Sequence, residues 1–245
     1  MCMRPLKDFL SVITQYLFPS GCSLCSEMLT EKDDILYGLC KNCRFKLPLC
    51  EKTCEYCGRP LVSEIGNCLD CRQLYNEDSP EQRPDYDKLS VLFPYTGKYR
   101  KLLWTFKYEK NTPVALFLAE KIIEVLKKEN LDKPVLVPVP PRPGKIKKTG
   151  WDQIKYLSAK LADVSPFPVL PCLVRTAKDT QKNLNRDDRR KNLKGKIIYK
   201  YKFSAPLTCV VFDDVITTGS TIDACAHALK KAGAGYVLGV SIFYD

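Results

Sequence analysis

The fold is decided by residues 210–221, which read VVFDDVITTGST. An apolar run ends in two adjacent carboxylates, Asp213 and Asp214, and a turn rich in Thr, Gly and Ser leads into a helical pattern. Parallel α/β sheets bind ligands at the carboxyl ends of their strands. The N–H groups of such a turn and the helix dipole favour a phosphate, and carboxylates accept sugar hydroxyls. The segment predicts a phosphosugar site, with a plain capped strand–turn–helix as the simpler alternative.

The sequence on either side of this segment alternates between apolar runs typical of strands and amphipathic stretches typical of helices. We expect strands at 89–95, 135–140, 167–174, 208–212 and 236–243, and helices at 116–128, 151–161 and 221–232. This alternation predicts a doubly wound parallel α/β sheet. Within residues 102–106, LLWTF, the spacing favours burial of both Trp104 and Phe106.

Eight cysteines form four CxxC pairs in the first third of the chain. They are Cys22, Cys25, Cys40, Cys43, Cys54, Cys57, Cys68 and Cys71. Two CxxC turns together supply the tetrahedral thiolate set that Zn²⁺ prefers, and four thiolates leave no open position for a substrate. We therefore expect two structural zinc sites. Disulfides and an iron–sulfur cluster are the alternatives, and the spacing leaves open whether the pairs act sequentially or interleave.

The composition is that of a globular chain with a basic second part. The 245 residues include 39 Lys+Arg, 28 Asp+Glu and one His, for a formal charge of +11. Residues 1–80 carry 9 Lys+Arg and 11 Asp+Glu, so the positive charge belongs to residues 81–245. Content of 45% hydrophobic and 27% charged residues excludes wholesale disorder. With a single histidine, His227, far from any nucleophile motif, a Ser–His–Asp arrangement is not visible.

These patterns divide the chain into three parts. Residues 1–20 predict an amphipathic helix that docks on the body, with weak peripheral membrane contact as the alternative. Residues 21–80 form the expected zinc-ribbon domain, and residues 86–245 the α/β domain. No apolar run reaches the roughly 18 residues that a transmembrane helix needs. We expect a cytoplasmic protein, since cysteine clusters there bind metal more often than they form disulfides.

Residues 210–221 resemble the PRPP-binding motif of type I phosphoribosyltransferases. The resemblance implies Mg²⁺ and PRPP as ligands, with Asp213 and Asp214 as the catalytic pair that holds the ribose hydroxyls. It also implies a 5-phosphate site made by Thr217, Thr218, Gly219, Ser220 and Thr221. In that family the loop after the first core strand, here residues 140–148, holds pyrophosphate. Arg142 would then contribute to PRPP binding, and a solvated basic turn is the alternative.

The order of segments is similar to the ComF family over nearly the whole chain. It runs from the cysteine pairs through Phe106-Lys107-Tyr108, a Val-Pro-Val-Pro strand and Gly150-Trp151-Asp152-Gln153 to the phosphoribosyl motif. The resemblance implies a role in natural competence and the handling of incoming single-stranded DNA. Implied partners are single-stranded DNA and a competence helicase or other DNA-processing proteins. Whether the chain also transfers phosphoribosyl to a nucleobase stays open.

The densest positive charge lies in residues 175–202, with 11 Lys+Arg and three Asp. Such charge could close over PRPP or contact a nucleic-acid backbone without reading its sequence. A polar strand face is the simpler alternative. The candidate nucleic-acid contacts are Arg175, Lys178, Lys182, Arg186, Arg189, Arg190 and Lys191.

The cysteine pairs generate the first prediction. Purified protein should contain two zinc ions per chain, because two four-thiolate sets contribute on the order of 10–16 kcal/mol each to folding of a metal-dependent unit. Elemental analysis by mass spectrometry measures the stoichiometry. A value well below two would contradict the two-site arrangement.

Overall fold

The structure is a computed structural model, and it describes residues 20–75, 83–176 and 193–245. Apart from its last residue, the helix expected over residues 1–20 lies outside these ranges. Among the described helices, none combines the length and apolar character needed to cross a membrane.

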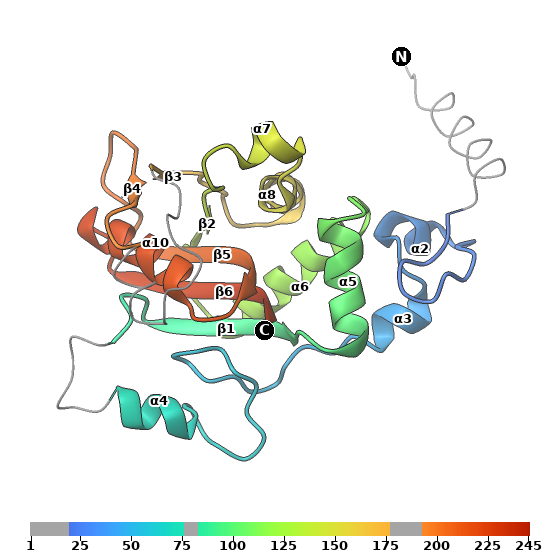
Figure 1. Cartoon of the computed structure of the whole chain (residues 1–245), viewed down its shortest axis with the longest axis horizontal. Helices are drawn as coiled ribbons and strands as arrows, with labels where there is room; N and C mark the ends of the chain where they lie inside the picture. Colours follow the sequence, from blue (N-terminus) through green and yellow to red (C-terminus); the bar gives the residue numbers. More distant parts are fainter. Residues whose placement is uncertain (1–19, 76–82, 177–192) are drawn as a thin grey trace.

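A four-stranded parallel sheet forms the centre of the protein (Figure 1). In spatial order its strands are β1 (Lys88–Pro94), β6 (Tyr236–Tyr244), β5 (Thr208–Ile216) and β2 (Val135–Pro138). The register places Val211 of β5 between Val137 and Gly239 on its two neighbours. Parallel sheets are buried on both faces, which is why these strands read as nearly continuous apolar runs. The expected doubly wound α/β architecture is confirmed.

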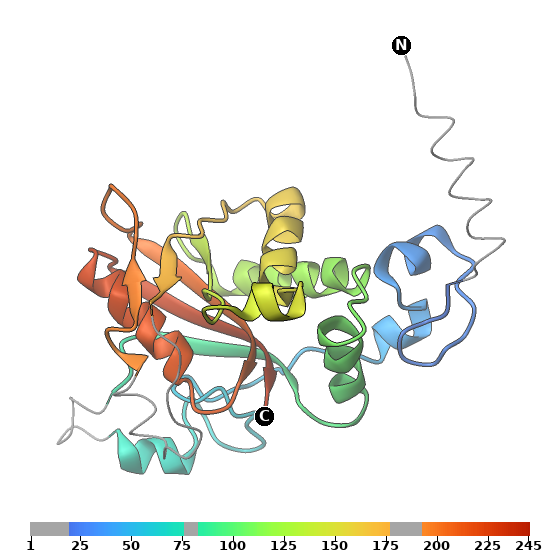
Figure 2. The same cartoon turned by 45° about the horizontal axis from the view of Figure 1, so that its top comes forward.

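Two apolar cores lie on opposite faces of the sheet, and successive residues of β5 point alternately into them. Val210 and Phe212 face a core made with three helices, α5 (Gly97–Lys107), α6 (Val114–Glu129) and α8 (Gln153–Val164). Cys209 and Val211 face the other core, which α10 (Ser220–Lys231) and the antiparallel pair β3 (Leu173–Arg175) and β4 (Ile197–Tyr199) cover (Figure 2). The short α7 (Lys145–Thr149) lies between β2 and α8.

The strand expected at 167–174 is mostly absent. Only Val169 bridges to Leu136 beside β2, through hydrogen bonds from the Leu136 N–H to the Pro168 carbonyl and from the Leu170 N–H to the Leu136 carbonyl, both 2.8 Å. Prolines at 166, 168 and 171 lack the N–H that a continuous ladder requires. The chain then turns to form β3, which pairs with β4 in a separate two-stranded sheet.

Burial of Trp104 is a second expectation that the structure overturns. Phe106 is fully buried, but Trp104 is 54% exposed. Helix α5 packs on the core through Leu102 and Phe106. Trp104 is two residues from each of them, about 200° around the helix, so it faces solvent.

The two cysteine sets lie in different places on the α/β body (Figure 1). The first set belongs to a region with α2 (Lys32–Tyr37) and α3 (Lys41–Phe45), whose Leu29, Leu39 and Leu47 join the core beneath α5 and α6. The second set and α4 (Leu69–Leu74) have a small core of their own that includes Tyr75. In Figure 1 the first region lies beside α5 and the second beneath β1.

The chain from Cys50 into the second cysteine set covers the outer edge of β1. The Cys50 N–H donates to the Leu92 carbonyl and the Leu89 N–H donates to the Glu55 carbonyl, both at 2.8 Å. The Tyr86 hydroxyl donates to the Tyr56 carbonyl. The two backbone hydrogen bonds occupy groups of β1 that an edge strand would otherwise present to other chains.

Gly58 generates a prediction because it combines a left-handed backbone with close contact to β1. Its φ is +75°, and a Cβ there would lie 2.5 Å from Val91 Cγ2. Gly58→Ala should lower the free energy of unfolding by about 2–4 kcal/mol, from left-handed strain plus overpacking. Denaturant unfolding of the zinc-loaded protein measures the change.

Gly66→Ala is the matched control. Gly66 has a φ of +74° in the same region, but a Cβ there meets nothing within 4 Å. It should show only the cost of the left-handed backbone, about 1–2 kcal/mol. Equal destabilisation by the two substitutions would contradict the close docking of the second cysteine region on β1.

Candidate functional site

The two carboxylates lie where β5 runs beyond its neighbour β2. The last β2–β5 pair joins Pro138 and Phe212, and the residues after Phe212 continue pairing with β6 as far as Ile216. Asp213 and Asp214 therefore occupy the carboxyl end of a central strand, beside the segment that leads from β2 to α8. This is the position at which open α/β sheets bind ligands.

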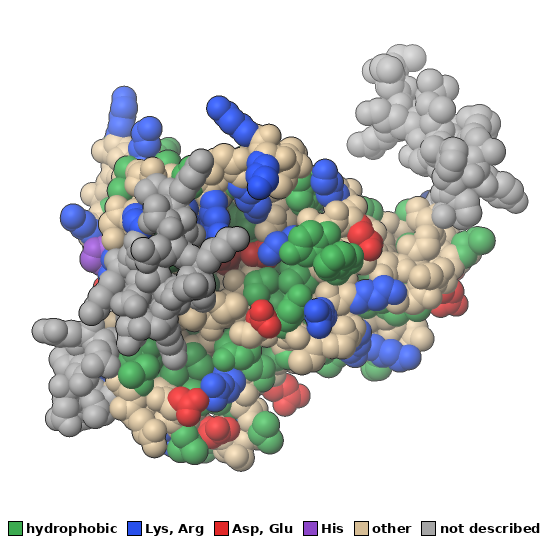
Figure 3. Space-filling view, in the orientation of Figure 1, with side chains coloured by type: hydrophobic (Ala, Val, Ile, Leu, Met, Phe, Trp, Pro, Cys, Tyr) green, Lys and Arg blue, Asp and Glu red, His purple; other side chains and the backbone are tan. Residues whose placement is uncertain are grey.

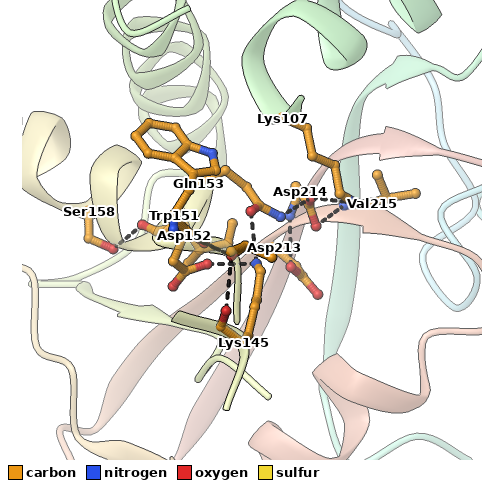
Figure 4. Close-up of polar contacts among 11 residues, drawn as sticks. Lys107, Lys145, Trp151, Asp152, Gln153, Ser158, Asp213, Asp214 and Val215 are labelled. Atoms are coloured by element: carbon orange, nitrogen blue, oxygen red, sulfur yellow. Dashed lines mark hydrogen bonds and ion pairs between the residues drawn. The ribbon is translucent and has the colours of Figure 1, made fainter. Parts of the chain in front are cut away.

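Asp214 is held by groups from two helices (Figure 4). Its Oδ2 accepts a hydrogen bond of 2.6 Å from Gln153 Nε2 and lies 3.1 Å from Lys107 Nζ. Its Oδ1 accepts from the Val215 N–H at 3.0 Å. The side chain is only 10% exposed. Helices α5 and α8 and strand β5 thus meet at one carboxylate.

The two carboxyl groups have opposite pKa shifts. Burial raises the pKa of Asp213, and the negative charge of Asp214 raises it further. Burial alone would also raise the pKa of Asp214, but the nearby Lys107 charge and the Gln153 hydrogen bond outweigh it, so that pKa is lowered. Asp214 is therefore a fixed anion. Asp213 is the member of the pair whose ionisation a bound cation would favour most.

A polar network extends from Asp214 to the segment after β2 (Figure 4). Lys145 Nζ donates to Gln153 Oε1 and to Asp152 Oδ1, both at 2.8 Å. From sequence, Lys145 belongs to the basic loop 140–148 that would hold pyrophosphate, whereas Lys107 and Gln153 were assigned no role. Those two lie in the segments Phe106-Lys107-Tyr108 and Gly150-Trp151-Asp152-Gln153, which carry the resemblance, but their contacts with Asp214 join residues far apart in the chain.

The loop after the two carboxylates forms a small pocket at the start of α10. Gly219 has a left-handed backbone, with φ of +76°, and the Thr218 and Ser220 hydroxyl oxygens are 2.8 Å apart. The pocket has a volume of about 40 Å³, and residues 215–222 line it together with Asp213. The structure thus brings Asp213 and the five candidate phosphate residues together.

Arg142 lies apart from that pocket. It is exposed on the segment between β2 and α7 and does not line the cavity. Its carbonyl accepts a hydrogen bond from the Lys145 N–H at 3.0 Å, at the start of α7. A role for Arg142 in binding the same ligand stays a prediction.

The cysteines assemble sequentially into two four-sulfur sets. Within each set all four Sγ atoms lie within 4.8 Å of one another. The Cys25–Cys40 and Cys57–Cys68 sulfur distances are both 3.7 Å. Zinc–sulfur bonds of ~2.3 Å in a tetrahedron place sulfurs about 3.8 Å apart, so both sets fit Zn²⁺.

The pKa shifts of the thiols in the second set fit a bound cation. Hydrogen bonds from Cys57 and Cys71 lower the pKa of Cys54, whereas the hydrogen bond with Cys54 raises that of Cys71. Four adjacent thiols therefore cannot ionise together by themselves. A Zn²⁺ ion supplies the charge that makes four thiolates stable side by side.

The candidate nucleic-acid residues are only partly described. Lys178, Lys182, Arg186, Arg189, Arg190 and Lys191 lie outside the described ranges. Arg175 is buried at the end of β3, with 7% exposure, so it does not present its charge to solvent. Lys194 pairs with Asp85 at 2.5 Å, which neutralises part of the described basic segment.

Comparison with known proteins supports this architecture. The double zinc ribbon domain family matches residues 13–72. Competence protein F of Haemophilus influenzae is 29% identical over 80% of this chain and 86% of its own length. The DNA utilization protein YhgH of Salmonella typhi is 26% identical over 82% of this chain and 94% of its own. Competence protein ComFC of Streptococcus pneumoniae is 23% identical over 85% of this chain and 88% of its own length.

Among solved structures, a Trypanosoma cruzi hypoxanthine phosphoribosyltransferase matches 56% of this chain and 66% of its own, at 14% identity and a TM-score of 0.36. That likeness is loose, and the fold class rests on strand order and register. The fold and the metal centres define a zinc-ribbon protein with a doubly wound α/β body. Over at least 80% of its length the chain is similar to proteins named competence protein F, YhgH and ComFC.

The Lys107–Asp214 pair generates a prediction on pH. Because the folded-state pKa of Asp214 is lowered, the stability it contributes is present above the ordinary carboxyl pKa and is lost as the pH falls through the lowered value. Lys107→Met should destabilise the protein by about 2–3 kcal/mol at pH 7, since it leaves a buried charge unpaired. The deficit should shrink in acid, where Asp214 becomes protonated.

Lys98→Met on the same helix is the control. Lys98 is exposed, so its substitution should change stability by less than about 0.5 kcal/mol at either pH. Urea unfolding of the three proteins at neutral and acidic pH measures both effects. A Lys107→Met deficit that stays constant with pH would refute the electrostatic role.

Proposed function

We propose that this chain acts in natural competence, in the handling of incoming single-stranded DNA, and that it binds PRPP with Mg²⁺ at the end of β5. Its relatives are named competence proteins and DNA utilization proteins, which supports the biological role. One observation supports PRPP with Mg²⁺ as the ligand. Asp213 lies beside a hydroxyl-lined pocket at the start of α10, next to an Asp214 carboxylate held as an anion.

The lining of the small pocket suits a phosphate group. Hydroxyls of Thr217, Thr218, Ser220 and Thr221 can donate to phosphate oxygens. Helix α10 adds the positive end of its dipole.

The adjacent carboxylates suit the ribose and its metal. Carboxylates accept hydrogen bonds from sugar hydroxyls and bind Mg²⁺ directly or through water. Asp213 would ionise fully when the cation arrives, because the bound charge reverses the effect of burial on its pKa. Lys107 and Gln153 keep Asp214 oriented, so its position does not depend on the ligand.

A second candidate function is phosphoribosyl transfer to a nucleobase. The Lys145–Gln153–Asp214 network favours it, because it connects the ribose-binding end of β5 to the segment that would hold pyrophosphate. In that reaction a nucleobase nitrogen forms a bond to the anomeric carbon as the bond to pyrophosphate breaks. Pyrophosphate release from PRPP across a panel of bases tests this candidate. No release with any base would refute it.

The PRPP site generates a prediction on ligand-dependent stability. PRPP with Mg²⁺ at a hundred times its dissociation constant should stabilise the protein by about 2.7 kcal/mol. The double substitution Asp213→Asn plus Asp214→Asn should abolish the thermal shift, whereas Asp163→Asn, at an exposed carboxylate of α8, should retain it. A shift that survives the double substitution would place the ligand elsewhere.

The role in competence is tested in a transformable host that lacks the gene. Complementation with wild-type protein should restore transformation by linear DNA. The Asp213→Asn plus Asp214→Asn protein should restore it poorly if the process needs the PRPP site. Immunoblotting controls for abundance. Wild-type protein that fails to restore transformation would refute the proposed role.

A further inference from the structure

Helix α5 carries two large aromatic side chains on its solvent-facing surface. Trp104 is 54% exposed and Tyr108 is 58% exposed, although both are large and apolar in part. Their ring centroids are 4.5 Å apart with an interplanar angle of 40°, as expected for residues four apart at the end of a helix. Figure 3 shows hydrophobic side chains exposed over α5.

The same surface of α5 carries positive charge without carboxylate partners. Lys98, Arg100 and Lys101 are exposed, and within the described parts of the chain none of them forms an ion pair. Lys101 Nζ instead donates to the Leu24 carbonyl at 2.7 Å, and the Arg100 guanidinium lies 5.6 Å from the Tyr95 ring. We call the set Lys98, Arg100, Lys101, Trp104 and Tyr108 the α5 stripe.

The neighbouring helix α6 shows the ordinary alternative. Its Lys121 and Lys128 both pair with Glu124, at 2.8 and 3.4 Å, so its surface charge is balanced within the helix. Helix α5 has no acidic residue from Gly97 to Lys107. The excess charge of the α5 stripe is therefore a local feature, not a property of every helix in a basic protein.

The stripe lies between two features already described. At one end Lys101 contacts Leu24, which lies between the first two cysteines of the first zinc set. At the other end Lys107, next to Tyr108, reaches down to Asp214 (Figure 4). A flexible polyanion on the stripe would thus lie beside the phosphoribosyl site.

We propose that the α5 stripe is a binding surface for single-stranded nucleic acid, which deepens the proposed function and depends on it. Unpaired bases stack on the Trp104 and Tyr108 rings, and phosphates contact the three cations. Stacking on exposed aromatic rings combined with basic residues is the chemistry by which proteins bind single strands without sequence preference. A duplex fits less well, because its bases are already stacked on one another.

Tryptophan fluorescence tests the stacking directly. The chain has two tryptophans, Trp104 and Trp151, so Trp151→Phe leaves Trp104 as the sole reporter. Oligothymidylate should quench it and shift its emission. Inorganic polyphosphate, a polyanion without bases, should not. Equal responses to the two polyanions, or no response to a bound oligothymidylate, would overturn the stacking role.

Affinity measurements separate the two parts of the stripe. Trp104→Ala should weaken oligothymidylate binding at least about fivefold with little change in salt dependence. Substituting Lys98, Arg100 and Lys101 together by Ala should reduce the slope of log affinity against log salt by about 2, since each single-strand phosphate contact contributes about 0.7. Trp104→Phe should retain most of the affinity.

The control substitutes an exposed aromatic residue elsewhere. Phe45, on α3, is 87% exposed, and Phe45→Ala should leave the affinity unchanged. Zinc content and thermal unfolding confirm that each variant is folded. If wild-type protein binds oligothymidylate and Trp104→Ala binds it equally well, the α5 stripe is refuted and the proposed function stands. If wild-type protein does not bind it at low salt, direct DNA contact itself is refuted.

Discussion

The Asp214 carboxylate and the Lys107 ammonium form the contact on which the arrangement of the site depends. A carboxylate at the buried end of a central strand is costly unless it is paired and hydrogen-bonded. Lys107 comes from α5 and Gln153 from α8, so satisfying one buried charge fixes two helices against β5. Asp213, beside the pocket, has a raised pKa because it is buried next to the Asp214 charge. The contacts with Lys107 and Gln153 thus fix both the position and the charge of the Asp214 carboxylate.

The zinc-binding regions are integrated with the α/β body. The first contributes Leu29, Leu39 and Leu47 to the core that α5 and α6 share with the sheet. The segment leading to the second lies along the outer edge of β1 and occupies its free backbone groups. Metal that orders these regions therefore also supports the body. This coupling gives closed four-thiolate sites a structural purpose without any role in chemistry.

The elements on either side of residues 210–221 could be predicted from sequence because strong local patterns determine them. Residues 208–212 and 236–243 are apolar because both sheet faces are covered, and the amphipathic pattern at 221–232 requires one buried face. Weaker patterns gave two wrong predictions. Residues 167–174 are apolar, but prolines prevent a ladder. In the run LLWTF, Trp104 lies opposite the buried face of α5, and burial in a short apolar stretch depends on where the neighbouring elements pack.

The sequence by itself determined the residue types and their order: eight cysteines at metal-binding spacing, two carboxylates at the end of an apolar strand, and a hydroxyl-rich turn before a helix. Local spacing suffices for these because each is built within a few residues of the chain. Only the tertiary structure decided that the cysteine sets are sequential, that Lys107 and Gln153 hold Asp214, and that Trp104 faces solvent. The two contacts to Asp214 join residues 61 and 107 positions apart, and no local pattern encodes the packing of helices on a sheet that brings them together.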